Sequence, residues 1–135
     1  PSCTTSSALA PSLTMKSAPR SFVAGQLTGV EGYVESTATG LLCGINAARL
    51  LEGREPVVPP ATTALGSLIA YVTDRDRKDF QPMNANYGLF PPLGQRMRGR
   101  DKKQALGQRA LAALGDWILE TGIENSERVL RTSSC

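Results

Sequence analysis

Glycines at positions 25, 29 and 32 are the residues of this chain whose spacing points most directly to chemistry. They follow a short apolar run, Phe22 to Gly25, that is typical of a buried strand, and they precede a long helix-compatible run that starts at about Tyr33. A strand-to-helix turn of this kind gathers unpaired backbone N–H groups at the positive end of the helix dipole. The stretch can therefore bind an electron-rich ligand edge, although a plain turn in any α/β domain would also use glycine.

A second stretch with chemical potential is the irregular segment from Phe80 to Pro92. Its prolines and its glycine disfavour a regular element, so we expect an ordered loop. Its carboxamides donate and accept hydrogen bonds at once, which suits the edge of a planar heterocycle. The candidates for substrate contact are Asn84, Asn86 and Tyr87. Carboxamides that brace the loop through its own backbone are an equally good interpretation, and Tyr87 or Tyr33 can either stack on a planar ring or pack in the core.

No residue stands out as a catalytic acid, base or nucleophile. The chain has no histidine, and its three cysteines, at positions 3, 43 and 135, lack the spacing of metal ligands. Cys43 lies inside the helix-compatible run, where a buried thiol that acts as a small hydrophobic residue is the better interpretation. We therefore expect no catalytic residue, no metal and no disulfide framework, and a reducing cytoplasm as the compartment.

The composition is that of one soluble domain. Of the 135 residues, 41% are hydrophobic and 20% are charged, and the net charge of +3 is mild. Apolar runs such as 41–45 are far shorter than the roughly 20 residues of a membrane-spanning helix. The charge is concentrated, however, because residues 96–109 contain six basic residues and one acid, Asp101. This basic cluster predicts either a contact with a nucleic-acid backbone or a solvated start of a helix.

Three helices are expected to position these stretches, at about 33–51, at about 64–73, and from 98 or 101 to 120. Gly53 should end the first helix, and Thr62 or Thr63 should cap the second. Two glycines inside the first helix, Gly40 and Gly44, each cost about 1 kcal/mol relative to alanine. We expect close packing against a sheet or a ligand to offset that cost. The apolar stripe of the last helix should pack on the rest of the chain.

Two longer strings of residues resemble a known family. The string AGQLTGVEGYVESTATGLLCGINAARLLEG, residues 24–53, closely resembles the C-terminal flavin-contacting motif of the bacterial folate- and FAD-dependent tRNA (uracil-54-C5)-methyltransferases. The string FQPMNANYGLFPPL, residues 80–93, is similar to the second signature of that family. The resemblance covers roughly residues 9–120, and two signatures in the right order are highly specific.

The resemblance implies an α/β flavoprotein fragment, namely the C-terminal part of an FAD/NAD(P)-binding Rossmann-like domain that is mostly helical here, with a few short strands. Residues 1–21 would be a partly irregular lead-in, 22–95 the C-terminal part of the FAD-binding domain, 96–122 a packing helix, and 123–135 a frayed tail. The family's N-terminal G-x-G-x-x-G fingerprint and its catalytic cysteines have no counterpart in this sequence. We therefore expect a chain that starts in the middle of a longer protein and is inactive alone.

The resemblance also implies a reaction and its ligands. The family moves a one-carbon unit from methylenetetrahydrofolate to C5 of uracil 54 in the tRNA T-loop, with FAD as cofactor and NADPH or NADH as reductant. The implied partners are tRNA and the missing N-terminal half of the same protein, with no membrane and no metal. The residues implied to bind FAD are Gly25, Gln26, Thr28, Gly29, Val30 and Glu31.

Two other interpretations stay open. The neighbouring glucose-inhibited division protein A family, which modifies the tRNA wobble uridine, has an FAD motif of the same shape, although residues 30–36 and the FQPMNANYG loop match the methyltransferases better. The chain could instead be a non-catalytic remnant whose basic cluster, Arg96 to Arg109, binds RNA or a protein partner.

Overall fold

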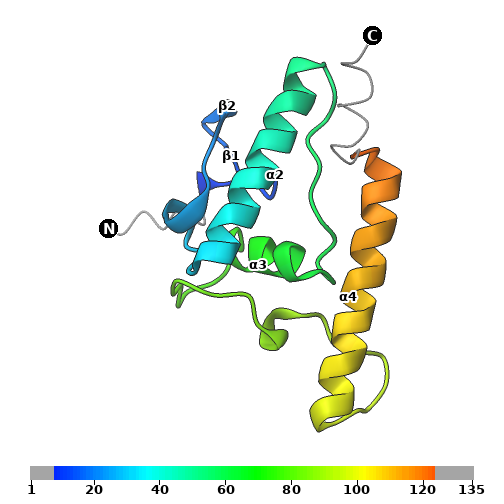
Figure 1. Ribbon diagram of the computed structural model, residues 1–135. Coiled ribbons are helices and arrows are strands. Elements are labelled where there is room, and N and C mark those ends of the chain that lie inside the picture. The colour runs from blue at the N-terminus through cyan, green and yellow to red at the C-terminus, as the bar shows by residue number, and fades with distance from the viewer. Residues whose placement is uncertain (1–7, 124–135) are drawn as a thin grey trace.

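The computed structural model describes residues 8–123, and these are mostly helical, as expected. Figure 1 shows the short helix α3 lying between the two long helices α2 and α4, with a small sheet beside α2. The elements in chain order are β1 (Thr14–Met15), β2 (Ala18–Phe22), the 3-10 turn η1 (Gly25–Thr28), α2 (Tyr33–Leu51), α3 (Ala64–Val72), the 3-10 turn η2 (Tyr87–Leu89) and α4 (Gly99–Thr121).

The strand expected at Phe22–Gly25 is wrong by several residues. β2 ends at Phe22, and it pairs antiparallel with β1 so that Thr14 lies opposite Phe22 and Met15 opposite Ala18. The strand is fixed by this upstream partner rather than by the apolar run that follows it. Gly25, with a φ of 68°, then begins η1, because a left-handed residue cannot continue a strand.

Helix α2 begins and ends at the expected residues. At its C-terminus, Gly53 has a φ of 72°, its N–H donates to the Leu50 carbonyl over 3.1 Å, and the Arg54 N–H donates to the Arg49 carbonyl over 2.8 Å. These two bonds form a Schellman motif, which satisfies carbonyls that the helix leaves unpaired. The local sequence, with glycine just past the last turn, therefore sets the length of α2.

Helix α3 joins the two halves of the core. The Thr63 hydroxyl caps it by accepting the Gly66 N–H over 3.0 Å, which confirms one of the two expected caps. Ile69 packs with one cluster, which contains Leu13, Leu42 and Cys43. The other side of α3 packs with Val30 in a second cluster, whose buried members from α3 are Leu68, Tyr71 and Val72. The expected apolar face of α3 is thus confirmed as core.

A buried asparagine ties α2 to both segments that flank it in the chain. Asn46 is fully buried, and its amide nitrogen donates to the carbonyls of Ser12 and Val57 over 3.2 and 3.0 Å. Its carbonyl oxygen accepts the Val57 N–H over 2.7 Å. Because all its polar atoms are paired, burial costs little, and the β1 lead-in and the 52–63 connector are held against α2.

Helix α4 is attached by arginines that donate to backbone carbonyls. The Arg49 and Arg54 guanidinium groups donate to the Thr121 carbonyl over 3.1 and 3.4 Å, where cations also complement the C-terminal helix dipole. Arg109 donates to the Pro91 and Pro92 carbonyls. The expected packing of the α4 stripe is confirmed in part, because Leu106 is buried and Trp117 packs against the cluster that contains Leu42, whereas Ile118 is 38% exposed.

The first prediction concerns Gly66, which lets α3 approach the 59–60 backbone. A Cβ at Gly66 would lie 1.9 Å from the Pro60 carbonyl oxygen, whereas a Cβ at Gly115 in α4 would meet no atom within 4 Å. Gly66→Ala should lower the free energy of unfolding by about 1–3 kcal/mol through overpacking. The control Gly115→Ala should raise it by up to about 1 kcal/mol. Chemical denaturation of both variants measures this, and a Gly66→Ala protein as stable as wild type would contradict the packing.

Candidate functional site

The glycine-rich turn forms a tight corner between η1 and α2. Gly25, Gly29 and Gly32 have φ values of 68°, 94° and 99°, all in the left-handed region that other residues avoid. At Gly29 a Cβ would also lie 2.2 Å from the tip of the Phe80 ring. The Gly25 N–H donates to the Thr39 hydroxyl over 2.9 Å, which fastens the corner to α2. The spacing of these glycines is therefore required by the backbone itself.

The corner pairs directly with the 80–92 loop. Val30 and Met83 form a parallel bridge, in which the Glu31 N–H donates to the Met83 carbonyl over 2.9 Å and the Met83 N–H donates to the Gly29 carbonyl over 3.0 Å. Two residues further along the loop, the Ala85 N–H donates to the Glu35 carboxylate over 3.2 Å. The two stretches that the sequence singles out are thus brought together in one place.

A polar cleft of about 610 Å³ lies where they meet. Its volume is within the range of ligand sites in proteins. The first turn of α2 borders the cleft, and its N-cap residue, Gly32, provides no side-chain cap. The unpaired N–H groups of that turn therefore place partial positive charge beside the cleft. The lining residues are Gln26, Glu31, Gly32, Tyr33, Ser36 and Asn84.

The residues expected to bind the cofactor fall into two groups. Gln26 and Glu31 line the cleft with exposed side chains. Thr28 and Val30 are buried, and the Thr28 hydroxyl donates to the Gly25 carbonyl over 2.7 Å, so these side chains shape the corner instead of facing the cleft. Any contact that Thr28 or Val30 makes with a ligand would run through the backbone.

The three loop residues also differ from one another. Asn84 lines the cleft. The Asn86 carboxamide accepts the Gly88 N–H over 2.9 Å and donates to the Asn84 carbonyl over 3.0 Å, so it braces the loop. Tyr87 is 47% exposed, and its ring lies 5.8 Å from that of Phe90. The two carboxamides thus differ: Asn84 is accessible to a ligand, whereas Asn86 braces the loop through its own backbone.

Sequence reasoning missed Glu35, the residue that joins α2 to the loop. Its only local signal is its position three residues after the N-cap, where an acid commonly favours a helix start. Its partner, Ala85, is 50 residues away in the chain. Nothing in the sequence around either residue indicates this contact.

Cys43, the cysteine among the described residues, is placed in the core rather than at the cleft. Cys43 is buried, its thiol donates to the Val23 carbonyl over 3.5 Å, and burial raises its pKa, which keeps the thiol protonated and unreactive. Residues 8–123 contain no group of three or more histidine, cysteine or acidic side chains that could hold a metal. In the same range, no helix combines the length and the apolar character that crossing a membrane requires.

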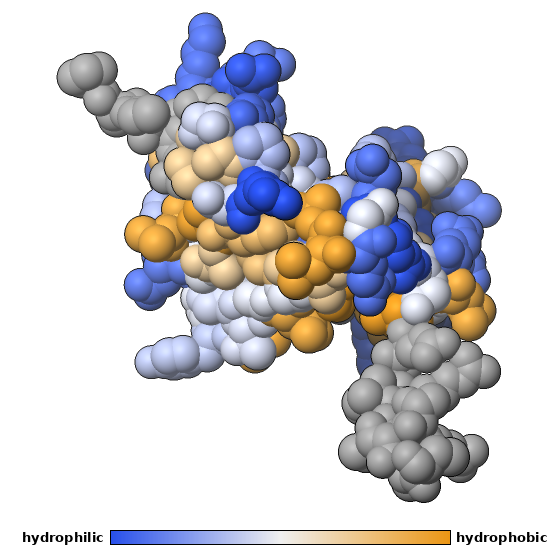
Figure 2. Space-filling model, turned by 90° about the horizontal axis from the view of Figure 1, so that it is seen from above, coloured by the Kyte–Doolittle hydropathy of each residue, from blue (hydrophilic) through white to orange (hydrophobic). Residues whose placement is uncertain are grey.

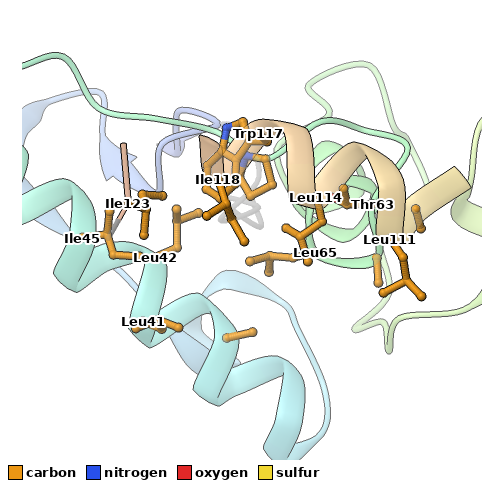
Figure 3. Close-up of a pocket in the computed structure, with 14 residues that line it drawn as sticks. Leu41, Leu42, Ile45, Thr63, Leu65, Leu111, Leu114, Trp117, Ile118 and Ile123 are labelled. Atoms are coloured by element: carbon orange, nitrogen blue, oxygen red, sulfur yellow. The ribbon is translucent and has the colours of Figure 1, made fainter. Parts of the chain in front are cut away.

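A second concavity, the apolar groove, separates α4 from α2 and α3. Seen from above, hydrophobic residues gather between the part of the molecule that contains α2 and the part that contains α4 (Figure 2). Figure 3 shows Leu41, Leu42 and Ile45 from α2 on one side and Leu114, Trp117 and Ile118 from α4 on the other, with Leu65 of α3 between them. Leu41 and Leu111 at its rim are 67% and 73% exposed. Because its walls are almost wholly apolar, the groove is suited to an apolar surface.

Comparison with known proteins gives one family model and many relatives. The model described as glucose inhibited division protein A matches residues 2–55, less than half of the chain. The relatives are named methylenetetrahydrofolate–tRNA-(uracil-5-)-methyltransferase TrmFO. That of Geobacter sulfurreducens is 54% identical over 82% of this chain and 25% of its own length. That of Desulforudis audaxviator is 56% identical over 84% of this chain and 26% of its own length.

These matches confirm the resemblance that the two signatures indicate. A third relative, from Heliobacterium modesticaldum, is 51% identical over 83% of this chain and 26% of its own length. The chain thus spans about a quarter of the length of the relatives it matches. Over most of its length, it is similar to a part of the methylenetetrahydrofolate-dependent tRNA (uracil-5-)-methyltransferases.

Proposed function

We propose that this chain is part of a flavoenzyme that methylates C5 of uracil 54 in the tRNA T-loop, with methylenetetrahydrofolate as the carbon donor. The observation that carries the proposal is the pairing of residues 29–31 with Met83, because it joins both signatures at one polar cleft. The chain spans about a quarter of its relatives, so the activity would belong to a longer protein. Within it, residues 22–95 would be the C-terminal part of a Rossmann-like FAD-binding domain, and the reaction would take place in the cytoplasm.

The cleft fits the electron-rich edge of a flavin. The uncapped first turn of α2 supplies backbone donors, and Gln26 supplies a side chain that can donate or accept. When bound, FAD would supply the hydride chemistry, and its reduced ring carries negative charge that a helix N-terminus stabilises by about 0.3–1 kcal/mol. Glu31 is exposed, which leaves its charge to solvent. Gly25 and Gly29 do not line the cleft, and the Phe80 ring covers Gly29, so these two glycines would shape the corner behind the ligand.

The loop side of the cleft would receive the folate and the uracil. Asn84 lies at the cleft with a carboxamide that matches a heterocycle edge, while Asn86 holds the loop in shape and Tyr87 offers a half-exposed ring. We assign no catalytic residue to this chain, since Cys43 is buried and protonated. The nucleophile, and the site for NADPH or NADH, would come from the rest of the longer protein.

The same longer protein would fill the apolar groove. Three-quarters of the relatives' length lies outside the match, and a groove with almost wholly apolar walls needs an apolar element to cover it. Helix α4 is held by carbonyl hydrogen bonds near Thr121 and Pro91, which leaves the groove open along its middle. We therefore assign the groove to another segment of the FAD-binding domain.

The basic cluster would contact the tRNA. The cations at 96, 98, 100, 102 and 103 are exposed, and the ion pairs within residues 8–123 join Arg54 with Glu52 and Arg77 with Asp74 only. Three of these cations lie in the first turns of α4, where the helix dipole disfavours positive charge. A polyanion that binds there would offset this cost. Arg109 is engaged with Pro91 and Pro92, so it serves the fold.

A second candidate is a wobble-uridine modification flavoprotein of the glucose-inhibited division A type. The match of that family model to residues 2–55 favours it. The model does not extend to the 80–93 loop, however, whereas the methyltransferase relatives match over four-fifths of the chain. The position of the modified uridine in the product tRNA distinguishes the two candidates.

The proposal is tested with a fusion in which this chain replaces the matching quarter of the Geobacter sulfurreducens methyltransferase. The fusion should purify with bound flavin and should form 5-methyluracil at position 54 of tRNA, as detected by nuclease digestion and mass spectrometry. The 135-residue chain alone should retain no flavin, because it provides one wall of the site. A flavin-bound isolated chain, or a flavin-bound fusion that leaves uracil 54 unmodified, would contradict the proposal.

The groove assignment predicts different effects of one substitution in the two contexts. Leu111 is 73% exposed in the chain described here, so Leu111→Asp should change its stability by less than about 1 kcal/mol. In the fusion, the aspartate would be buried, and the cost should exceed about 2 kcal/mol. Ala112→Asp is the matched control, since Ala112 is exposed and lies outside the groove. Equal losses for both variants in the fusion would argue against burial of the groove.

The tRNA contact predicts a change in salt dependence. Lys102→Ala with Lys103→Ala should weaken tRNA binding by the fusion and should reduce the steepness of log K against log salt by about 1.5, if each lysine contacts one phosphate. The control, Arg75→Ala with Lys78→Ala, removes two exposed cations from another loop and should leave the slope unchanged. Titration of tRNA at several salt concentrations gives both slopes. Identical slopes for the two double variants would remove the basic cluster as a tRNA contact.

A further inference from the structure

The hydrogen bonds between the corner and the loop continue where the backbone pairing stops. The Met83 N–H donates to the Gly29 carbonyl, and two residues later the Ala85 N–H donates to a carboxylate oxygen of Glu35. In an extended segment, N–H groups two residues apart point to the same side. The Glu35 side chain therefore takes the place of the next strand residue, where the chain has already turned into α2.

The corner is shaped to admit this carboxylate. Gly32 lies three residues before Glu35, and a Cβ at Gly32 would lie 2.2 Å from the second carboxylate oxygen of Glu35. The glycine therefore has two roles, since it accepts a φ of 99° and leaves room for the acid. Glu35 is half-buried in the first turn of α2, where the helix dipole stabilises a negative charge.

We propose that Glu35 is a positioning residue that fixes the loop carboxamides relative to the glycine-rich corner between η1 and α2. Its hydrogen-bond donor, the Ala85 N–H, belongs to the residue between Asn84, which lines the cleft, and Asn86, which braces the loop. Glu35 itself is absent from the cleft lining, so it acts through the loop rather than on a ligand. This inference rests on the proposed function, because the carboxamides matter only if the loop side of the cleft receives the folate or the uracil.

The first measurement uses the 135-residue chain and does not depend on the proposed function. Hydrogen exchange followed by mass spectrometry reports the protection of the 83–86 amides. Glu35→Ala should speed exchange of the Ala85 amide about tenfold, because a hydrogen bond to a charged acceptor is lost. Glu35→Gln keeps an acceptor oxygen and should stay within about twofold of wild type. The control Glu120→Ala removes an exposed acid from α4 and should change nothing at these amides.

The second measurement uses the fusion and separates positioning from general structure. Glu35→Ala should raise the KM for methylenetetrahydrofolate about tenfold while the flavin content stays unchanged, and Glu35→Gln should restore most of the affinity. An unchanged KM, a loss of flavin in step with activity, or a glutamine variant as impaired as the alanine variant would overturn the inference. If the wild-type fusion neither binds flavin nor methylates tRNA, the proposed function fails, and an unchanged exchange rate at Ala85 would separately overturn the Glu35 contact.

Discussion

The backbone pairing between residues 29–31 and Met83 is the constraint on which the cleft depends. It joins segments more than 50 residues apart, and each contributes groups that the other cannot supply. The corner contributes backbone donors and left-handed glycines, while the loop contributes neutral carboxamides. The pairing is possible because Gly29 carries no Cβ to collide with Phe80, and because Val30 turns its side chain into the core. The residue types at 29 and 30 thus serve the packing as much as any ligand.

The core that supports this pairing is small and centred on α3. Its two clusters lie on opposite sides of α3. Asn46 fixes α2 to the segments that contain Ser12 and Val57. Toward α4 the apolar interior opens into the groove instead of closing. Gly40 and Gly44 are also open, since a Cβ at either would meet no atom within 4 Å. The two glycines lower the stability of α2, and no close packing within residues 8–123 offsets that loss. This is consistent with a further surface packed against the helix.

The helices could be predicted from the sequence because their determinants are local. Thr63 caps α3 and Gly53 ends α2 through contacts within a few residues, so pattern and capping were sufficient. The strand expected at residues 22–25 is misplaced because β2 takes its position from pairing with β1, which no apolar run reveals. The α4 stripe was correctly read as apolar, but periodicity cannot say what covers a helix face. Glu35 was missed for the same reason, since its partner, Ala85, belongs to a distant loop.

Under the proposed function, the chemistry of the cleft suits the binding of ligands rather than their transformation. Its side chains are a carboxamide on each side, a hydroxyl, a tyrosine and one exposed acid. The nearest thiol, Cys43, is directed at the Val23 carbonyl inside the core. Uncapped helix amides and neutral carboxamides can orient a planar heterocycle through its hydrogen-bonding edge. The proton transfers and covalent steps of a methyl transfer would then require residues from outside this chain, and the open apolar groove provides the surface on which the rest of the protein can dock.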